Sequence, residues 1–489
     1  MANLFATLFR NRKRTSAEVD EEPIRGELYS IERLEQFAAT LAIEHKVSDK
    51  RERGRQLLPR LEENRQKLIA AYRSLGLAIS NERTISPAAE WLVDNFHIVE
   101  EQLREIREDL PKSYYYELPK LVDGELAGYP RIYAIALALV AHTDSRLDSE
   151  TLRRFIRSYQ QESALTIGEV WALAISLRLA LVENLRRLTT RVVDSREERE
   201  EADKLADRLL GMAARPPEEL IAVINERWRR REKLGRAFIV HLAQRLRDQD
   251  PAIMAVLERL EQFLIGRGET KEQLVHLEHQ RQATAQVTVG NIITSMRLLS
   301  TLDWRDFFED VSLVDPILGD DPAGAYARME FASRDRYRHV IERIAKRTRV
   351  DELEVARRAV QLAAESQINQ PQDTRRAHIG YHLIDDGVPE LEKGFNYRQR
   401  LGEKFTRAIF RHPTLVYLGM FSILTALIAG GFLYYADRSG ASPLMLALCA
   451  LVVLIPASDL ALSVLNWDVT RVFHPRVLPR MKTSDGIPE

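Results

Sequence analysis

The stretch 413–435 constrains this chain more than any other feature, because it contains no charged residue. As an α-helix at about 1.5 Å per residue it would reach roughly 34 Å, more than the hydrocarbon core of about 30 Å. A second apolar stretch, 442–465, follows a short link at 436–441 and contains Pro456 and Asp459. Proline removes a backbone donor and is expected to kink this second helix. We predict two transmembrane helices, 413–435 and 442–465, joined as a tight hairpin.

Lys and Arg residues orient the predicted hairpin. They are frequent on both of its flanks, whereas the link contains only Arg438. Cytoplasmic flanks of membrane helices carry an excess of Lys and Arg, so both flanks are expected in the cytoplasm and the link outside. The basic residues are Arg398, Arg400, Lys404, Arg407 and Arg411 before the first helix, and Arg471, Arg476, Arg480 and Lys482 after the second. The sequence therefore predicts a multi-pass membrane protein whose N- and C-terminal ends are cytoplasmic.

Two features inside the hairpin suggest further roles. Gly430 and Gly431 could let a neighbouring helix approach closely. Asp459 is the one acid in the second span, and an acid inside a membrane is a candidate functional residue. The alternative for Asp459, which we favour, is a position near the inner interface, close to Trp467.

Helical periodicity dominates the chain from about residue 30 to residue 365. Ser86 and Pro87 are typical of a helix start, with serine as the N-cap and proline in the first turn. The helix that follows is expected to run without a break until Pro111 stops it. We predict an all-α fold: a multi-helix cytoplasmic bundle followed by the two-helix transmembrane hairpin.

A long apolar stripe from residue 166 onward predicts a central helix. The charged stretch 195–208 that follows is either a solvated helix, which we favour, or a mobile connection. The domains that we expect are a mobile basic tail at 1–25, helical domains at 26–193 and 194–370, a juxtamembrane connector at 371–412, the transmembrane helices at 413–435 and 442–465, and a cytoplasmic linker at 466–489.

The composition excludes several classes of function. A formal net charge of −1 gives no overall attraction to nucleic acid, so we expect no nucleic-acid partner. The single cysteine, Cys449, excludes an intrachain disulfide and a thiolate metal cluster. Neither G-x-x-x-x-G-K-[ST] nor G-x-G-x-x-G occurs, so no phosphate-cradling loop is predicted. We therefore expect no cofactor, no metal site and no catalytic residue in this chain.

His142, Asp144 and Arg146 form the one polar group that follows a long apolar run. They could build a polar pocket at the end of a helix. The alternative is that histidine and arginine near the last carbonyls of a helix cap it and interact favourably with its dipole.

Seven long strings in the chain carry a family resemblance. Two of them are EEPIRGELYSIERLEQFAATLA from Glu21 and GNIITSMRLLSTLDWRDFFEDVSLVDPILGDDPAGAYARMEFASRDRYRHVIERIA from Gly290. The other five are EWLVDNFHIVEEQLREIREDLPKSYYYELPKL from Glu90, GYPRIYAIALALVAHTDSRLD from Gly128, LTIGEVWALAISLRLALVENLRRL from Leu165, HIGYHLIDDGVPELE from His378 and LIPASDLALSVLNWDVTRVFHPRVLPRMKTSDGIPE from Leu454. All seven resemble the N-terminal region of cyclic β-1,2-glucan synthases, and the resemblance extends over nearly the whole chain past residue 20.

The resemblance implies a very large protein of the bacterial inner membrane. It implies a cytoplasmic glucosyltransferase domain that uses UDP-glucose and a divalent cation, a C-terminal domain related to glycoside phosphorylases, and a cyclic glucan delivered to the periplasm. The chain is expected to stop before both catalytic domains, because it ends at SDGIPE. Its expected partners are inner-membrane lipid, the two catalytic domains in cis or as a split partner, and the growing β-1,2-glucan.

Three tyrosines are candidates for contact with that glucan. Tyr114, Tyr115 and Tyr116 are consecutive and could stack on sugar rings. The alternative is that tyrosines next to prolines pack locally.

Three hypotheses follow for the function of the chain. The favoured one is the membrane-anchoring and scaffold region of a synthase, inactive by itself. The second is a stand-alone membrane-anchored adaptor or sensor. The third is an independent catalyst that uses a cleft in the helical domain, such as one near His142.

Overall fold

The computed structural model describes residues 22–48, 54–109, 112–230, 235–247, 251–266, 268–472 and 480–481. The predicted tail at 1–25 lies mostly outside these residues, as does most of 473–489. The chain divides into two compact units, Met1–Asp315 and Pro316–Glu489. The described residues form 21 α-helices, one 3-10 helix and a single two-stranded ribbon. The predicted all-α class is therefore confirmed.

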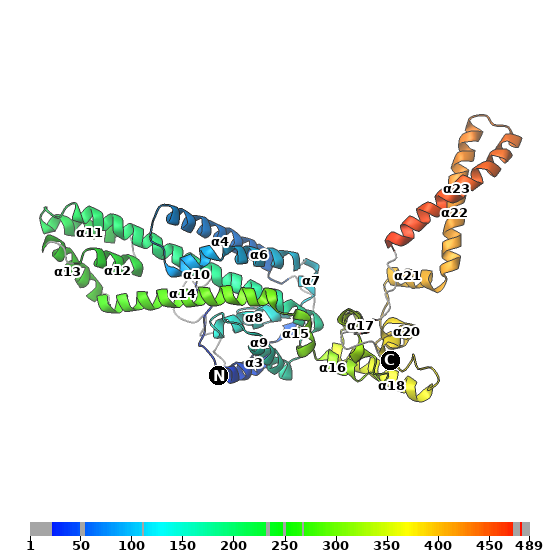
Figure 1. Cartoon of the computed structure of the whole chain (residues 1–489), viewed down its shortest axis with the longest axis horizontal. Coiled ribbons are helices and arrows are strands. Elements are labelled where there is room, and N and C mark those ends of the chain that lie inside the picture. The colour runs from blue at the N-terminus through cyan, green and yellow to red at the C-terminus, as the bar shows by residue number, and fades with distance from the viewer. Residues whose placement is uncertain are drawn as a thin grey trace. The chain divides into compact units, whose positions relative to one another are not determined.

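The first unit contains helices α3 to α15 and the ribbon of β1 with β2 (Figure 1). These elements are α3 (Ile31–Glu44), β1 (Val47–Ser48), α4 (Leu57–Ser80), α5 (Pro87–Asp94), α6 (Phe96–Asp109), α7 (Lys112–Glu117), β2 (Lys120–Leu121), α8 (Arg131–His142), α9 (Ser149–Glu162), α10 (Ile167–Leu210), α11 (Pro217–Arg230), α12 (Arg236–Arg245), α13 (Pro251–Ile265), α14 (Lys271–Thr301) and α15 (Trp304–Val311).

Helix α10 is the central element of the first unit. Thr166 starts it with a capping box: its hydroxyl accepts from the Glu169 backbone N–H at 3.2 Å, and the Glu169 carboxylate accepts from the Thr166 N–H at 3.0 Å. The helix packs against α4, α8, α12 and α14. It continues through 195–208, so this charged stretch is helical as favoured, although Ala202 and Ala206 within it are buried.

The predicted helix after Pro87 is broken by Asn95 into α5 and α6. The start is as expected, because the Ser86 hydroxyl accepts from the Ala89 N–H. The Asn95 side chain donates to the Trp91 carbonyl at 2.9 Å and accepts from Arg297 at 2.6 Å. A side chain that bonds to backbone groups of its own helix competes with the regular ladder, which explains the interruption.

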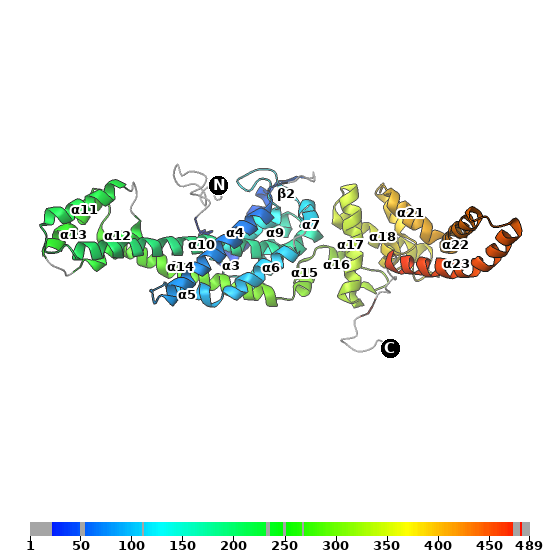
Figure 2. The same ribbon diagram turned by 90° about the horizontal axis from the view of Figure 1, so that it is seen from above.

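A second core lies at the far ends of α10 and α14, where α11, α12 and α13 gather (Figure 2). Its buried residues include Ala202, Ala206, Leu209, Leu220, Ile224, Phe238, Leu242, Ile253 and Leu260. Helix α12 begins directly after Gly235, and the Glu198 carboxylate accepts from the backbone N–H groups of Ala237 and Phe238. A Cβ at Gly235 would lie 1.9 Å from that carboxylate, so a larger residue there would require the Glu198 side chain to move away.

The second unit contains the remaining helices. They are α16 (Val314–Gly319, which begins in the first unit), η1 (Tyr326–Arg328), α17 (Phe331–Thr348), α18 (Glu352–Asn369), α19 (Ile379–Ile384), α20 (Val388–Gly394), α21 (Leu401–Arg411), α22 (Pro413–Arg438) and α23 (Pro443–Val472).

Asp321 organises the part of this unit formed by η1, α17 and α19. Its carboxylate accepts from the N–H groups of Ala325, Tyr326 and Ile379 and bonds to His378 Nδ1 at 2.8 Å. Burial by itself raises the pKa of Asp321, but these hydrogen bonds and the His378 charge hold that pKa below its usual value. The buried acid therefore joins the turn before η1 to the start of α19.

Helices α22 and α23 pack against each other along their length. Their contact face consists of the buried residues Thr425 and Ala429 on α22 and Ala457, Ala461 and Leu465 on α23. Gly430 and Gly431, which could let a neighbouring helix approach closely, take no part in the contact with α23, since a Cβ on either glycine would meet no atom of the described residues within 4 Å. Small residues do form the contact, but they are threonine and alanines one turn apart.

Candidate functional site

The turn between α8 and α9 contains two consecutive non-glycine residues in the left-handed region. Asp144 and Ser145 both have positive φ values, 51° and 61°. Left-handed non-glycine residues cost on the order of 1–3 kcal/mol each, and they persist only where surrounding contacts fix them. Asp144 and Ser145 follow His142 by two and three residues, and Asp144 belongs to the polar group that the sequence predicted.

Helices α10 and α14 supply the contacts that fix this turn. Asp144 accepts from the Thr288 hydroxyl at 2.8 Å, and its carbonyl accepts from the Asn291 amide at 3.0 Å. The Ser145 carbonyl accepts from Ser295 at 2.7 Å, and the Ser145 hydroxyl accepts from the Asn184 amide at 2.8 Å. The turn is therefore a rigid junction between helices that are far apart in the sequence.

His142 lies inside the fold rather than in an open pocket. Its ring stacks on Tyr29 with centroids 4.3 Å apart and contacts Phe37, and its Nδ1 lies 2.7 Å from the Glu27 carbonyl. Burial lowers the pKa of His142, so the neutral ring donates from Nδ1 to that carbonyl. His142 thereby fixes residues 22–30, which we call the strap, against the end of α8.

The structure separates the three predicted polar residues. His142 and Asp144 are buried, whereas Arg146 is exposed to solvent. Arg25 on the strap is the arginine that reaches Asp144, with its Nε 3.6 Å from Asp144 Oδ1. The polar or glucan-contacting site proposed for His142, Asp144 and Arg146 stays a prediction.

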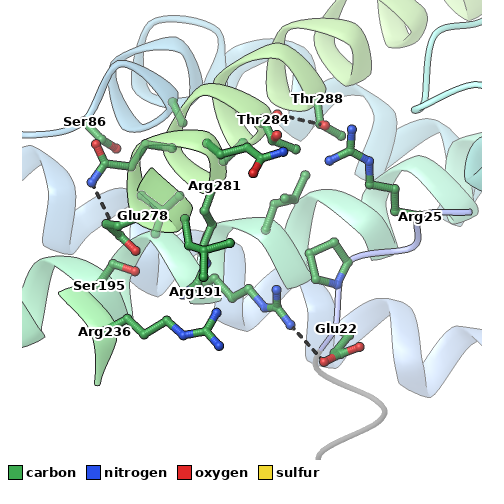
Figure 3. Close-up of a pocket in the computed structure, with 18 of the residues that line it drawn as sticks. Glu22, Arg25, Ser86, Arg191, Ser195, Arg236, Glu278, Arg281, Thr284 and Thr288 are labelled. Carbon is green, nitrogen blue, oxygen red and sulfur yellow. Dashed lines mark hydrogen bonds and ion pairs between the residues drawn. The ribbon is translucent and has the colours of Figure 1, made fainter. Parts of the chain in front are cut away.

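A cleft of about 460 Å³ opens beside this junction, between the strap, α10, α14 and the start of α12 (Figure 3). Five arginines line it, together with the acids Glu22 and Glu278, and we call it the arginine cleft. The arginines are Arg25, Arg191, Arg199, Arg236 and Arg281. Thr288, which donates to Asp144, also lines the cleft and connects it to the junction.

The five arginines differ in their partners. Arg25 pairs with Asp144 and Arg191 pairs with Glu22, each at 3.6 Å. Among the described residues Arg199 donates to the Ser195 carbonyl, and Arg236 and Arg281 form no ion pair within 4 Å. The Arg281 charge nevertheless acts on Glu198, where it opposes the rise in pKa that burial causes. Guanidinium groups that keep free donors in a cleft are suited to bind phosphate or carboxylate groups.

Glu278 is the buried acid of the cleft. The residue is 3% exposed, and its Oε1 accepts from the Gln282 amide at 3.0 Å. Its Oε2 is buried and has no hydrogen-bond partner among the described residues. A buried carboxylate oxygen without a donor costs free energy, so this atom is an open acceptor position.

Sequence reasoning missed the arginine cleft because its residues come from distant segments that match no motif. A partial signal exists in α10, where Arg191, Ser195 and Arg199 recur at four-residue steps and so lie on one face of the helix. Glu278 and Arg281 on α14 are three residues apart and therefore also share a face. The pairing of these two faces depends on tertiary packing, which no local pattern states.

The predicted tyrosines lie around α7 and differ in exposure. The ring of Tyr115 is buried, and its hydroxyl donates to the Arg55 carbonyl. Tyr114 and Tyr116 are partly exposed, and the Tyr114 hydroxyl donates to the Gly168 carbonyl. Buried Lys120 donates to the Tyr115, Tyr116 and Leu118 carbonyls, which holds this segment together. Stacking of sugar on these tyrosines stays a prediction.

Asp459 lies on α23, outside the face that contacts α22. The Tyr417 hydroxyl donates to Asn466 Oδ1 at 2.8 Å and sets the register of the two antiparallel helices. Asp459 is seven residues before Asn466 (466 − 459 = 7), which corresponds to about 10 Å along the helix. That distance places it level with the middle of α22. Among the described residues, no group of three or more His, Cys, Asp or Glu could hold a metal ion.

These observations define an α-helical protein with a charged interior, an arginine-lined cleft and a C-terminal pair of apolar helices long enough to cross a bilayer. The chain is homologous to part of a known enzyme, the cyclic beta-(1,2)-glucan synthase NdvB of Rhizobium meliloti (strain 1021), with 32% identity over 486 residues. The match includes 96% of this chain but only 16% of that synthase. The resemblance to such synthases is thus confirmed as homology to one segment, and no family model matches the chain.

Proposed function

We propose that this chain is the membrane-anchoring and scaffold region of a cyclic β-1,2-glucan synthase of the bacterial inner membrane. In this role α22 and α23 span the membrane and the helical units lie in the cytoplasm. The anchor holds a glucosyltransferase activity at the inner leaflet, where UDP-glucose is available, either in the same polypeptide or as a separate partner.

The exposed apolar surface of α22 and α23 is the observation that carries this proposal. Of the 18 residues that form the most apolar window of each helix, only 6% are buried in α22 and 11% in α23. An apolar helix in the core of a soluble protein is mostly buried, and a secretory signal lies at the N-terminus, so neither alternative fits these helices. A bilayer covers such surfaces without further protein contacts.

Helix α21 supports the same placement, because it leads directly into α22. Leu401 and Phe405 are 85% and 70% exposed on one face of this helix. The other side is fixed to the second unit: Arg407 pairs with Glu392 at 2.5 Å, and Glu403 pairs with Arg347 at 3.1 Å. An exposed apolar face next to a membrane span, with basic residues beside it, is typical of a helix at the membrane interface.

Reporter fusions test the topology. Alkaline phosphatase, which is active only outside the cytoplasm, is fused after His412, Gly440 or Val472. We expect activity after Gly440 alone, because the link between the two helices then faces outward. Activity after His412 would contradict the cytoplasmic placement of the helical units.

A chimera tests the scaffold role. The matching segment of the Rhizobium relative is replaced by this chain, and cyclic glucan is measured in a strain that lacks its own synthase. We expect glucan production by the chimera and none by a matched version lacking α22 and α23. An inactive chimera that is present in the membrane at normal levels would favour the alternative of a membrane-anchored adaptor.

A further inference from the structure

We infer that the arginine cleft binds a phosphorylated ligand of nucleotide size, a nucleoside diphosphate in chemical class. Its phosphates lie among Arg199, Arg236 and Arg281, and an N–H group of its base donates to Glu278. This inference concerns the first unit alone and does not depend on the membrane placement proposed above.

The dimensions of the cleft fit this class of ligand. Small-molecule sites occupy about 300–1,000 Å³, and the cleft of about 460 Å³ lies within that range. Its walls come from the strap, α10 and α14, which the Asp144 junction holds in fixed positions. The cleft is therefore built by the fold and does not depend on one loose loop.

The charges of the cleft favour an anion. Five arginines and two acids line it, which gives a formal excess of three positive charges (5 − 2 = 3) in a chain whose net charge is −1. Arg25 and Arg191 are paired with Asp144 and Glu22, so the groups with donors left for a ligand are Arg199, Arg236 and Arg281, the last of which also has the Glu198 charge nearby. In Figure 3 the labelled Arg281 side chain lies between the strap side of the cleft and Glu278. Guanidinium groups bind phosphate through paired, charge-assisted hydrogen bonds.

Glu278 decides between a bare anion and a nucleotide. A carboxylate oxygen that is buried and unpartnered repels an inorganic anion but accepts a hydrogen bond from an N–H group. Gln282 already occupies Oε1, so one oxygen, Oε2, is open to the ligand. A ligand that satisfies all four groups needs phosphates at one end and a hydrogen-bond donor at the other, as a nucleoside diphosphate has.

Isothermal titration of the full chain in detergent tests this inference, with UDP, ADP and pyrophosphate as probes. We expect binding of at least one nucleoside diphosphate, weakened by added salt, and pyrophosphate binding weaker on the order of tenfold. Arg236→Gln is the main variant because this side chain is exposed and forms no ion pair with any residue that the structure describes, and it should weaken all three probes on the order of tenfold. Arg146→Gln, an exposed arginine outside the cleft, is the matched control and should change nothing.

Glu278→Gln distinguishes binding of the phosphates by the arginines from binding of the base by Glu278. It should weaken the nucleoside diphosphate toward the level of pyrophosphate, while pyrophosphate itself binds more tightly because a repelling charge is lost. Thermal unfolding of each variant confirms that it is folded. Absence of binding for all three probes, or equal binding by Arg236→Gln and the Arg146→Gln control, would overturn the inference.

Discussion

The interior of the first unit and the surface of α22 and α23 are opposites. The first unit buries charges: the Arg131 side chain, 4% exposed, pairs with Glu169, and Glu183 accepts from several arginines at once. Helices α22 and α23 instead expose large apolar residues, such as Leu415, Leu418, Ile423, Leu427, Leu451 and Ile455. Charged groups cost free energy in lipid, and a large exposed apolar surface costs free energy in water. The contrast fits the proposal that the chain meets two solvents, water around the first unit and lipid around the helix pair.

Glu183 shows how the charged interior is made stable. Arg60, Arg186 and Arg187 donate to its carboxylate at 3.0, 3.0 and 2.7 Å, and the Asn64 amide donates at 2.6 Å. Burial by itself raises the pKa of Glu183, but the three arginines outweigh burial and hold that pKa far below its usual value. The carboxylate therefore stays charged and joins α4 to α10.

Removing the Glu183 charge is expected to have the largest effect, because it tests whether buried charge stabilises the first unit. Glu183→Gln leaves buried Arg186 and its neighbours without their anion, and we expect a loss of about 3–5 kcal/mol in the free energy of unfolding. Urea unfolding followed by tryptophan fluorescence measures it. Glu219→Gln is the matched control, because Glu219 pairs with Arg215 four residues away, as Glu183 does with Arg187, but on the surface. The control should cost at most about 0.5 kcal/mol, and equal losses would contradict a special role of buried charge.

Asp459 is the one acid within the apolar part of α23. We expect its substitution to change free energy nearly as much as Glu183→Gln. An aspartate at the centre of a membrane helix costs about 2.5–3.5 kcal/mol of insertion free energy, and much less near an interface. From the Tyr417–Asn466 register we expect the central position, so Asp459→Leu should improve insertion of α23 by about 3 kcal/mol. Glycosylation-based insertion assays of α23 measure this change, with Asp468→Leu near the helix end as the control. Equal small gains from both substitutions would place Asp459 at the interface.

The sequence predicted what depends on local pattern and missed what depends on packing. The uncharged run at 413–435, the Ser86 cap and the helical character of 195–208 follow from composition, periodicity and cap chemistry, and the structure has all three as helices or helix starts. The break at Asn95 and the alanine contacts of α22 with α23 depend on partners from other segments, Arg297 in one case and Ala461 in the other.

The candidate site was predictable only in part for the same reason. The sequence selected His142 and Asp144 because they follow an apolar run, and both lie at the junction beside the cleft. It could not pair them with Arg25, which is more than a hundred residues away, or gather Arg199, Arg236 and Arg281 from three helices. Such residues meet only through the packing of α10 against α12 and α14.

His45 makes the stability of the first unit depend on pH. Burial, with the Arg131 charge nearby, lowers the pKa of His45 from 6.5 to about 4, and its Nδ1 lies 2.9 Å from the Tyr159 hydroxyl. Between pH 6.5 and about 4, His45 binds a proton in the unfolded chain but not in the folded chain. The free energy of unfolding therefore falls as the pH falls through this window. At about 1.4 kcal/mol per unit, His45 should contribute a loss of up to about 3 kcal/mol.

Unfolding measured at several pH values tests this dependence. His45→Gln keeps a hydrogen-bonding group near Tyr159 but cannot titrate, so its stability should fall less than that of the original chain between pH 6.5 and 4. His97→Gln is the control, because His97 is exposed and should leave the dependence unchanged. Parallel pH profiles for the original chain and His45→Gln would show that His45 is not the source.

The smallest expected effect is at α21, where the proposed boundary between water and lipid lies. Because Cys449 is the only cysteine in the chain, Cys449→Ala gives a background in which single cysteines can be labelled. An environment-sensitive fluorophore at Phe405→Cys should emit at shorter wavelength in liposomes than at Thr406→Cys, because Phe405 lies on the exposed apolar face and Thr406 is turned about 100° away from it. The helix is held by Arg407 and Glu403, so the two labels report on depth and not on unfolding. Equal emission at both positions would mean that α21 stands clear of the bilayer, and the boundary between the two solvents would then lie at Pro413, where α22 begins.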